Sequence, residues 1–347
     1  MNRFRIALLA VATLVVGLVV LSVVRPPMPP SISNSASAAV LPTDQRVSAP
    51  EFTGLDGWLN TSPLTLSSLH GHVVLVDFWT FSCVNCVRTL PHLAALYTHF
   101  KADGFVIVGV HSPEFDFEKD PANVAAAVHR LGVTWPVALD SQMATWNAYS
   151  NQYWPAEYLV DAQGRIAYVH YGEGDYDTTA SAVAELLGVA KMGGSAPTAV
   201  PSDITPELYA GSERGQLADG ESYGQQGVPM AYPDAGPPAQ GDAIQVTGSW
   251  VDQGQYLQAA SPGHVRLRFH ADTVYVVAGT AGGSLTAAVR LDGASVSSGM
   301  SGTELQGSSV AVPRQDLFAL LQNVPSGQHL IDLAVPAGFR LYTFTFG

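Results

Sequence analysis

The sequence predicts an α/β domain built on a mixed sheet, followed by an all-β antiparallel sandwich, behind an apolar amino-terminal span. Three observations support this prediction. Residues 6–24 form an unbroken run of apolar or small residues, residues 51–190 alternate between strand and helix patterns, and residues 243–347 contain short strand patterns separated by Gly and Ser clusters. Hydrophobic residues make up 47% of the 347-residue chain, so both domains can bury a core.

The charge and cysteine content exclude several classes of protein. Lys and Arg number 16 against 29 Asp and Glu, which gives a net charge of −13. Nucleic-acid-binding proteins carry concentrated positive charge, so we expect no nucleic-acid partner. The chain has 2 cysteines, Cys83 and Cys86, too few for a disulfide-stapled mini-protein or a four-cysteine zinc site, and we expect no metal.

Residues 1–25 are expected to be a membrane anchor or a signal, and residues 26–50 a spacer rich in Pro, Ser and Ala. Arg3 and Arg5 precede the apolar run, which as a helix is about 28 Å long, close to the thickness of a bilayer core. A cleaved signal peptide is the alternative, although its apolar region is usually only about 7–15 residues long. In either case we expect the bulk of the chain to lie outside the cytosol, on a single-pass anchor if uncleaved.

The α/β domain, residues 51–190, is expected to begin with a central strand, because the apolar run over 73–79 is typical of a strand buried on both faces. The turn at 161–164 predicts a hairpin near the end of the domain. The expected elements are strands over 73–79, 105–110, 137–139, 157–160 and 166–170, and helices over 86–101, 122–131, 143–149 and 180–187.

The second domain, residues 243–347, is expected to contain only short strands. Pro, Gly, Ser and Ala dominate residues 191–242, which we expect to be a linker or an irregular arm. Apolar residues alternate with Arg or His along 264–270, so one side of that strand should be buried and the other solvated. The expected strands are 244–250, 264–270, 274–278, 285–291, 329–335 and 339–346, with one helical pattern over 315–321.

Cys83 and Cys86 directly follow the 73–79 strand and open the next helix. The unpaired N–H groups and the dipole of a helix N-terminus stabilise a thiolate, so Cys83 is the expected nucleophile. Cys86 faces the same side of the helix and can resolve a mixed disulfide by bonding to Cys83. The alternatives are a static disulfide, half of a metal site, and copper handling that also uses His111.

Two further positions could serve this cysteine pair. Asp77 lies in an apolar strand, where burial would raise its pKa and allow proton exchange with Cys86; a satisfied core aspartate is the alternative. His111 ends the next strand at the sheet edge that carries Cys83, and Glu114 and Glu118 follow it. These residues could line a groove for client proteins and tune the thiols, or they could be solvated loop residues.

The run VVLVDFWTFSCVNC, followed by Pro91 and Trp154-Pro155, resembles the thioredoxin-fold domains of the TlpA/ResA-like envelope class. The segments GVHSPEFDFEK, TWNAYSNQYWPAEYLVD, YGEGDY and TPELY, together with the β-rich tail, are more similar to the extracytoplasmic region of bacterial DipZ-type proteins. The resemblance implies a thioredoxin fold with a TlpA-like insertion, and a carbohydrate-binding-module-like jelly roll at the carboxyl end.

The resemblance also implies roles for individual residues. Cys83 and Cys86 would be the redox pair, Asp77 the buried acid and Pro155 a cis-proline, and no cofactor is implied beyond the redox-active disulfide itself. The groove candidates, with His111 and Glu114 included, are Trp79, Val84, Asn85, Trp154, His111 and Glu114.

The implied function is that of a membrane-anchored extracytoplasmic thiol–disulfide oxidoreductase whose partners are client proteins with cysteines or disulfides. The family class favours reductive maturation of envelope proteins, apocytochromes among them, although the residues themselves leave the direction open. DipZ-type proteins carry a multi-helix electron-conducting membrane domain, whereas this chain has a single apolar span, so a separate membrane electron donor such as a CcdA-like protein is expected. The alternative is a module that binds cell-wall glycan or protein on a redox-silent scaffold; the sugar-stacking candidates are Trp250, Tyr256, Tyr275 and Tyr342.

Overall fold

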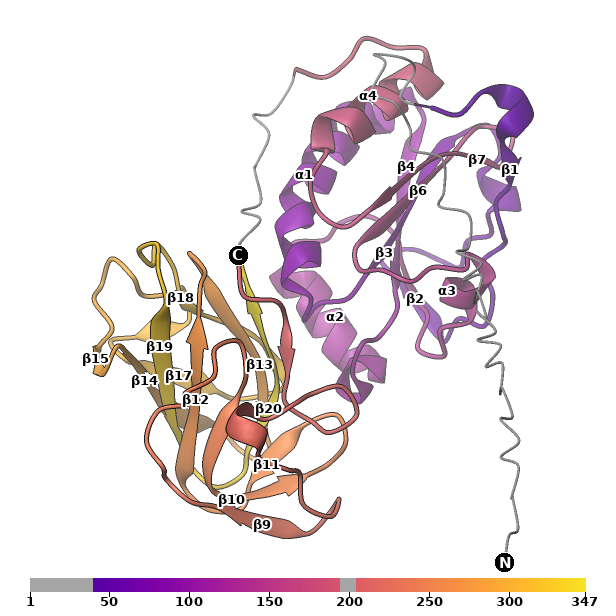
Figure 1. Cartoon of the computed structure of the whole chain (residues 1–347). Helices are drawn as coiled ribbons and strands as arrows, with labels where there is room; N and C mark the ends of the chain where they lie inside the picture. Colours follow the sequence, from indigo (N-terminus) through magenta and orange to yellow (C-terminus); the bar gives the residue numbers. More distant parts are fainter. Residues whose placement is uncertain (1–39, 194–203) are drawn as a thin grey trace, which may run out of the picture. The chain divides into compact units, whose positions relative to one another are not determined.

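The computed structural model describes residues 40–193 and 204–347, in which two separate sheets carry the fold (Figure 1). The expected anchor over residues 6–24 and most of the spacer lie outside the described residues. Within the described ranges, no helix has the length and hydropathy needed to cross a membrane.

The first sheet has seven strands in the order β1-β7-β6-β3-β4-β5-β2. Every element expected in the α/β domain is present, with small differences at the ends. The strands are β1 (Val47–Ser48), β2 (Gly57–Leu59), β3 (Val73–Trp79), β4 (Phe105–His111), β5 (Val137–Leu139), β6 (Ala156–Val160) and β7 (Arg165–Tyr171). The helices are α1 (Val84–Phe100), α2 (Pro121–Arg130), α3 (Ala144–Ala148) and α4 (Tyr176–Leu187).

Strand β3 lies at the centre of this sheet, parallel to β4 and antiparallel to β6. All seven of its residues are buried, because helices cover both faces of the sheet. Leu75 and Trp79 belong to the core formed with α1, α2 and α4, whereas Phe78 belongs to the core formed with α3. Side chains alternate along a strand, so Asp77 faces the same core as Leu75 and Trp79, which also contains Cys86.

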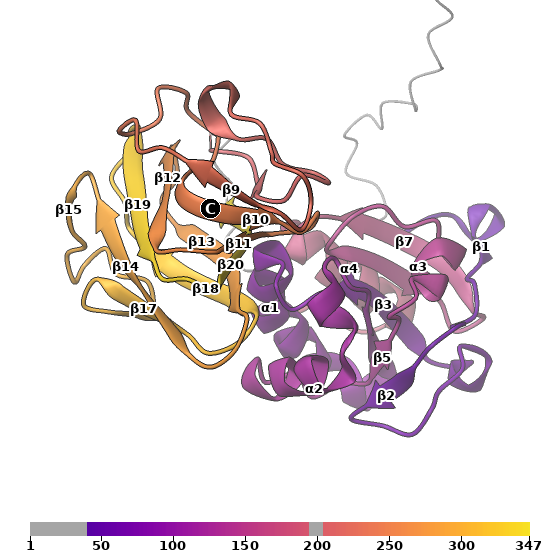
Figure 2. The ribbon, with the colours of Figure 1, turned by 90° about the horizontal axis from the view of Figure 1, so that it is seen from below.

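The second sheet forms an antiparallel β domain of thirteen strands, and it curves round on itself to enclose one large apolar core (Figure 2). Its strands are β8 (Leu208–Tyr209), β9 (Pro229–Tyr232), β10 (Gln245–Asp252), β11 (Leu257–Ala259), β12 (Gly263–Phe269), β13 (Val274–Thr280), β14 (Leu285–Leu291), β15 (Ala294–Ser295), β16 (Leu305–Gln306), β17 (Ser309–Val312), β18 (Asp316–Leu321), β19 (His329–Val335) and β20 (Phe339–Phe346).

Two segments of the β domain differ from expectation. The described part of the expected linker contributes two strands, since β8 pairs with β20 and β9 pairs with β10. The helical pattern over 315–321 is wrong, because this segment is strand β18, paired with β13. A short apolar run is compatible with either a helix or a strand. Here the segment becomes a strand because it can pair with the edge of β13.

Strand β10 changes partners at Gly248. Residues before this glycine pair with β12, whereas Gly248 and the residues after it pair with β9 and β11. Gly248 has a φ of 95°, a region that glycine enters without steric cost. A Cβ at this position would lie 2.9 Å from the carbonyl oxygen of Pro262, so both the backbone angle and the close approach require glycine.

Replacing this glycine should therefore destabilise the β domain. We expect Gly248→Ala to lower the free energy of unfolding by about 1–3 kcal/mol, measured by urea denaturation. Gly282→Ala is the matched control, because Gly282 has no left-handed φ and a Cβ there would meet nothing within 4 Å. Equal stability of the two variants would contradict this account of β10.

Candidate functional site

The two cysteines lie at the amino-terminal end of α1. Cys83 is the N-cap residue, and its Sγ accepts a hydrogen bond from the backbone N–H of Cys86 at 3.2 Å. Both are free thiols; Cys83 is partly exposed, whereas Cys86 is only 1% exposed. The helix N-terminus and this hydrogen bond favour negative charge on the Cys83 sulfur, so Cys83 is the thiol that can attack another molecule.

A pair of buried carboxyl groups lies beneath Cys86. Asp77 and Glu157 are register partners on β3 and β6, so their side chains leave the same face of the sheet. Burial, and then the neighbouring Glu157, raise the pKa of Asp77 well above its usual range. Burial also raises the pKa of Cys86, with smaller contributions from Cys83 and Asp77. Asp77 thus interacts with Cys86, and the proton exchange between them that the sequence suggested stays a prediction.

Glu157 was not predicted from the sequence, although a carboxylate in the apolar strand PAEYLV was an available signal. It is 2% exposed, and burial raises its pKa to about 7. Its Oε2 accepts a hydrogen bond from Thr179 Oγ1 at 2.9 Å, and that hydroxyl lies 3.2 Å from the hydroxyl of Tyr168. Hydrogen-bonding groups thus run from the buried acid to the half-buried Tyr168.

The pocket beside Cys83 has a volume of about 260 Å³ and contains four of the predicted groove residues. Trp154 is held there by a hydrogen bond from its Nε1 to the Ser112 carbonyl at 2.9 Å, and the Trp154–Pro155 bond is cis, as the resemblance implied. The lining residues are Cys83, Val84, Asn85, Glu114, Gln152, Tyr153, Trp154, Glu207, Tyr209, Arg214 and Thr345.

Two of the proposed groove residues lie below the surface and do not line this pocket. Trp79 is 1% exposed and His111 is 2% exposed. Burial lowers the pKa of His111 to about 3, so its ring is neutral, and it stacks on Phe81 with ring centroids 5.5 Å apart. In the part of the chain that the structure describes, no three His, Cys, Asp or Glu residues gather as metal ligands, so the copper alternative gains no support.

The β domain contributes four residues to the pocket, and none of them was predicted from the sequence: Glu207, Tyr209, Arg214 and Thr345. The Tyr209 hydroxyl lies 2.8 Å from Glu114 Oε1 and 3.0 Å from Glu207 Oε2. Arg214 Nη1 donates to Glu114 Oε1 at 2.8 Å, and its guanidinium lies 3.8 Å from the centre of the Tyr209 ring. Glu207, Tyr209 and Arg214 fall within the segment expected to be a linker, where composition gave no structural signal, whereas Thr345 lies in the expected strand over 339–346.

Glu118, which the sequence placed with His111 and Glu114 as a groove candidate, does not line this pocket and lies below the surface. Its side chain is fully buried and accepts hydrogen bonds from the hydroxyls of Thr80 and Ser82, just before Cys83. It also accepts hydrogen bonds from the backbone N–H groups of Glu114 and Phe115, at 2.7 and 3.0 Å. Glu118 therefore ties the loop that carries Cys83 to the loop that lines the pocket.

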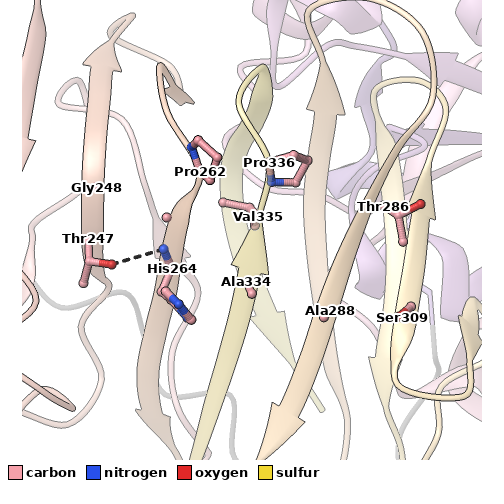
Figure 3. Close-up of a pocket in the computed structure, with 11 residues that line it drawn as sticks. Thr247, Gly248, Pro262, His264, Thr286, Ala288, Ser309, Ala334, Val335 and Pro336 are labelled. Carbon is pink, nitrogen blue, oxygen red and sulfur yellow. Dashed lines mark hydrogen bonds between the residues drawn. The ribbon is translucent and has the colours of Figure 1, made fainter.

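A second pocket, of about 530 Å³, lies in the β domain alone. Figure 3 shows His264, Ala334 and Ala288 on neighbouring strands of this pocket, whose walls contain no Phe, Tyr or Trp side chain. Of the sugar-stacking candidates, Trp250 and Tyr342 are buried. Tyr256 packs on Tyr342 with ring centroids 4.8 Å apart, and Tyr275 interacts with the Arg88 side chain. These rings pack within the protein and do not line this pocket.

The buried acid gives a testable dependence of stability on pH. The folded-state pKa of Glu157 is about 7, above the ordinary 4.5, so stability should fall as the pH rises through this interval. Glu157→Gln removes the free-energy cost of ionising this buried carboxyl group. It should raise the unfolding free energy near pH 8 by on the order of 3 kcal/mol, with no gain near pH 4. Urea denaturation at both pH values measures this.

Glu185→Gln is the control for this experiment, because Glu185 is an exposed acid on α4. It should change stability little at either pH. A Glu157→Gln protein that is less stable than the wild type near pH 8 would contradict the assignment of Glu157 as a carboxylate that is costly to ionise.

Comparisons with known proteins show which family the chain resembles. The Redoxin family model matches residues 45–187, and the model described as thioredoxin like C-terminal domain matches residues 205–347. Protein DipZ of Mycobacterium bovis is 36% identical over 315 residues, which cover 86% of this chain and 43% of DipZ. The chain thus spans less than half the length of that relative.

Thiol-disulfide oxidoreductase YkuV of Bacillus subtilis is 31% identical over 124 residues, which cover 35% of this chain and 82% of YkuV. Among solved structures, a putative thiol:disulfide interchange protein DsbE from Chlorobium tepidum is 26% identical with a TM-score of 0.37, over 42% of this chain and 99% of that one. The match to YkuV, most of whose length is covered, and the two matched family models confirm the resemblance to thioredoxin-fold oxidoreductases that the sequence indicated. The chain belongs to the thioredoxin-like thiol-disulfide oxidoreductase family.

Proposed function

We propose that this oxidoreductase reduces disulfides of envelope proteins through Cys83 and Cys86, outside the cytosol, tethered by its amino-terminal apolar run. The observation that carries the proposal is the asymmetry of the two thiols. Cys83 is partly exposed in a pocket at a helix N-terminus, and Cys86 is buried behind it with a raised pKa. One thiol can therefore attack a client while the other stays protonated until it is needed.

The first step is attack by the Cys83 thiolate on one sulfur of the client disulfide. A bond forms between Cys83 Sγ and that sulfur while the client disulfide breaks, and the departing client thiolate takes up a proton. The N–H of Cys86, which donates to Cys83 Sγ, stabilises the negative charge before the attack.

In the second step, Cys86 loses its proton and attacks Cys83 Sγ. Asp77 faces the same core as Cys86 and is the group placed to accept that proton in its ionised form. The second client thiolate leaves, so the client has gained two electrons and Cys83 and Cys86 are joined in a disulfide. A dithiol donor, for which we propose a separate membrane protein of the CcdA-like class, then reverses these steps and restores both thiols.

The reductive direction, with apocytochromes among the clients, is favoured by the family resemblance. We expect a midpoint potential near the roughly −270 mV of thioredoxin, measured by equilibrating the pair with dithiothreitol redox buffers. A potential near the roughly −120 mV of DsbA would instead make the protein an oxidant and overturn the reductive assignment.

The exchange itself is tested by trapping. Cys86→Ser should accumulate mixed disulfides through Cys83, because the resolving thiol is gone, and non-reducing gels followed by mass spectrometry identify the clients. Cys83→Ser is the matched control and should trap none. If the doubly substituted protein retains the same partners as the wild type, the alternative of a binding module on a redox-silent scaffold is favoured.

A further inference from the structure

The pocket beside Cys83 is built from both domains. The α/β domain supplies the cysteine and one wall, and the β domain supplies a second wall that consists of Glu207, Tyr209, Arg214 and Thr345. A client that reaches the Cys83 sulfur must therefore pass residues of the β domain. This gives the β domain a direct part in choosing the client.

The β-domain wall is held firmly against the α/β domain. Phe115 and Phe117 pack on Tyr342, with ring centroids 5.2 and 4.9 Å apart. Arg130 donates to both carboxylate oxygens of Asp316 at 2.7 Å, and Asp316 is only 3% exposed. Because the wall is already in place before a client arrives, little ordering entropy is lost when the client binds.

The charges in this wall are not balanced. Arg214 pairs with Glu114, whereas the hydrogen-bond partners of Glu207 are the neutral hydroxyls of Tyr209 and Thr343. Two carboxylates thus share one guanidinium. Desolvation, and then the neighbouring Glu114, raise the pKa of Glu207 to about 7, and Arg214 offsets part of this; with two carboxylates and one cation, the wall lacks one positive charge. A cation brought by a client would supply it.

A pair of exposed aromatic rings borders the same pocket. Tyr153 lines the pocket and is 53% exposed, and Tyr171, at 51% exposed, packs on it with ring centroids 5.1 Å apart. Large exposed rings next to a reactive group indicate an interaction surface for a protein chain. This observation is independent of the charges in the β-domain wall.

We propose that Glu207, Tyr209 and Arg214 of the β domain, together with Glu114, form a selective wall that favours client segments with a lysine or arginine beside the reactive cysteine. The aromatic pair supports the client segment where it borders the same pocket. This inference rests on the proposed thiol exchange at Cys83. It assigns the β domain to substrate selection in that reaction.

Two synthetic peptides test the proposal. They differ only in the residue after a single cysteine, Lys or Glu, and each is a mixed disulfide with 2-mercaptoethanol. The reduced protein converts each to the free peptide thiol and 2-mercaptoethanol, while Cys83 and Cys86 form a disulfide. We expect the wild type to reduce the Lys peptide about fivefold faster at low salt. This preference should vanish near 1 M salt, where the Debye length is about 3 Å.

Two variants should move the preference in opposite directions. Glu207→Gln removes an acid and should bring the ratio of the two rates close to one. Arg214→Gln removes the only cation among the lining residues and should raise the ratio. General damage to the domain interface would instead change the ratio of the two rates in the same direction for both variants. Glu304→Gln, an exposed acid of the β domain that does not line the pocket, is the control and should keep the wild-type ratio.

Hydroxyethyl disulfide, which is small and neutral, separates this inference from the proposed function. A wild type that reduces hydroxyethyl disulfide but treats both peptides equally overturns the selective wall and leaves thiol exchange standing. A ratio that neither Glu207→Gln nor Arg214→Gln changes also overturns the wall. Failure to reduce any of the three disulfides overturns the thiol exchange on which the inference rests.

Discussion

The buried carboxylate of Glu118 is the constraint on which the arrangement of the site depends. Burying a carboxylate without partners would cost several kcal/mol, and here hydroxyl and backbone donors on two loops offset that cost. Ser82 directly precedes Cys83, and Glu114 reaches the pocket and the β domain. One side chain therefore fixes the position of the nucleophile relative to the wall that the β domain provides. Loss of this group would free both loops together.

The site uses carboxyl groups in two opposite ways. Asp77 and Glu157 are buried register partners whose pKa values are raised chiefly by burial, so both favour the protonated form, and Asp77 is the one that also raises the pKa of Cys86. Glu114 and Glu207 lie at the pocket, where Arg214 offsets part of their charge. Carboxyl groups therefore hold protons beneath the N-terminus of α1 and contribute charge at the pocket above it. The difference arises because solvent and a cationic side chain reach only the pair at the pocket.

The sequence allowed the α/β elements, the cysteine pair and Asp77 to be predicted because each has a local signal: an apolar run, a helix start, or a charge where apolar residues are expected. Local signals do not report which loops meet in space. Glu118 was placed in the groove with His111 because nothing local shows that two loops donate hydrogen bonds to it, and Tyr209 and Arg214 lie in the stretch whose composition suggested a linker. His111 was misplaced in the groove for the same reason, since the end of a strand does not reveal that Phe81 covers it.

The distribution of aromatic side chains favours a role for the β domain within the redox site over a separate sugar-binding role. Stacking on a sugar needs an exposed ring, yet Tyr342 and Tyr256 are used where the two domains meet or beside it, and the pocket of Figure 3 is lined by small side chains. In the described ranges, the exposed aromatic side chains are Tyr153 and Tyr171, and both lie beside the Cys83 pocket. Because exposed rings are retained where a partner covers them, the partner of this protein is expected at the cysteines.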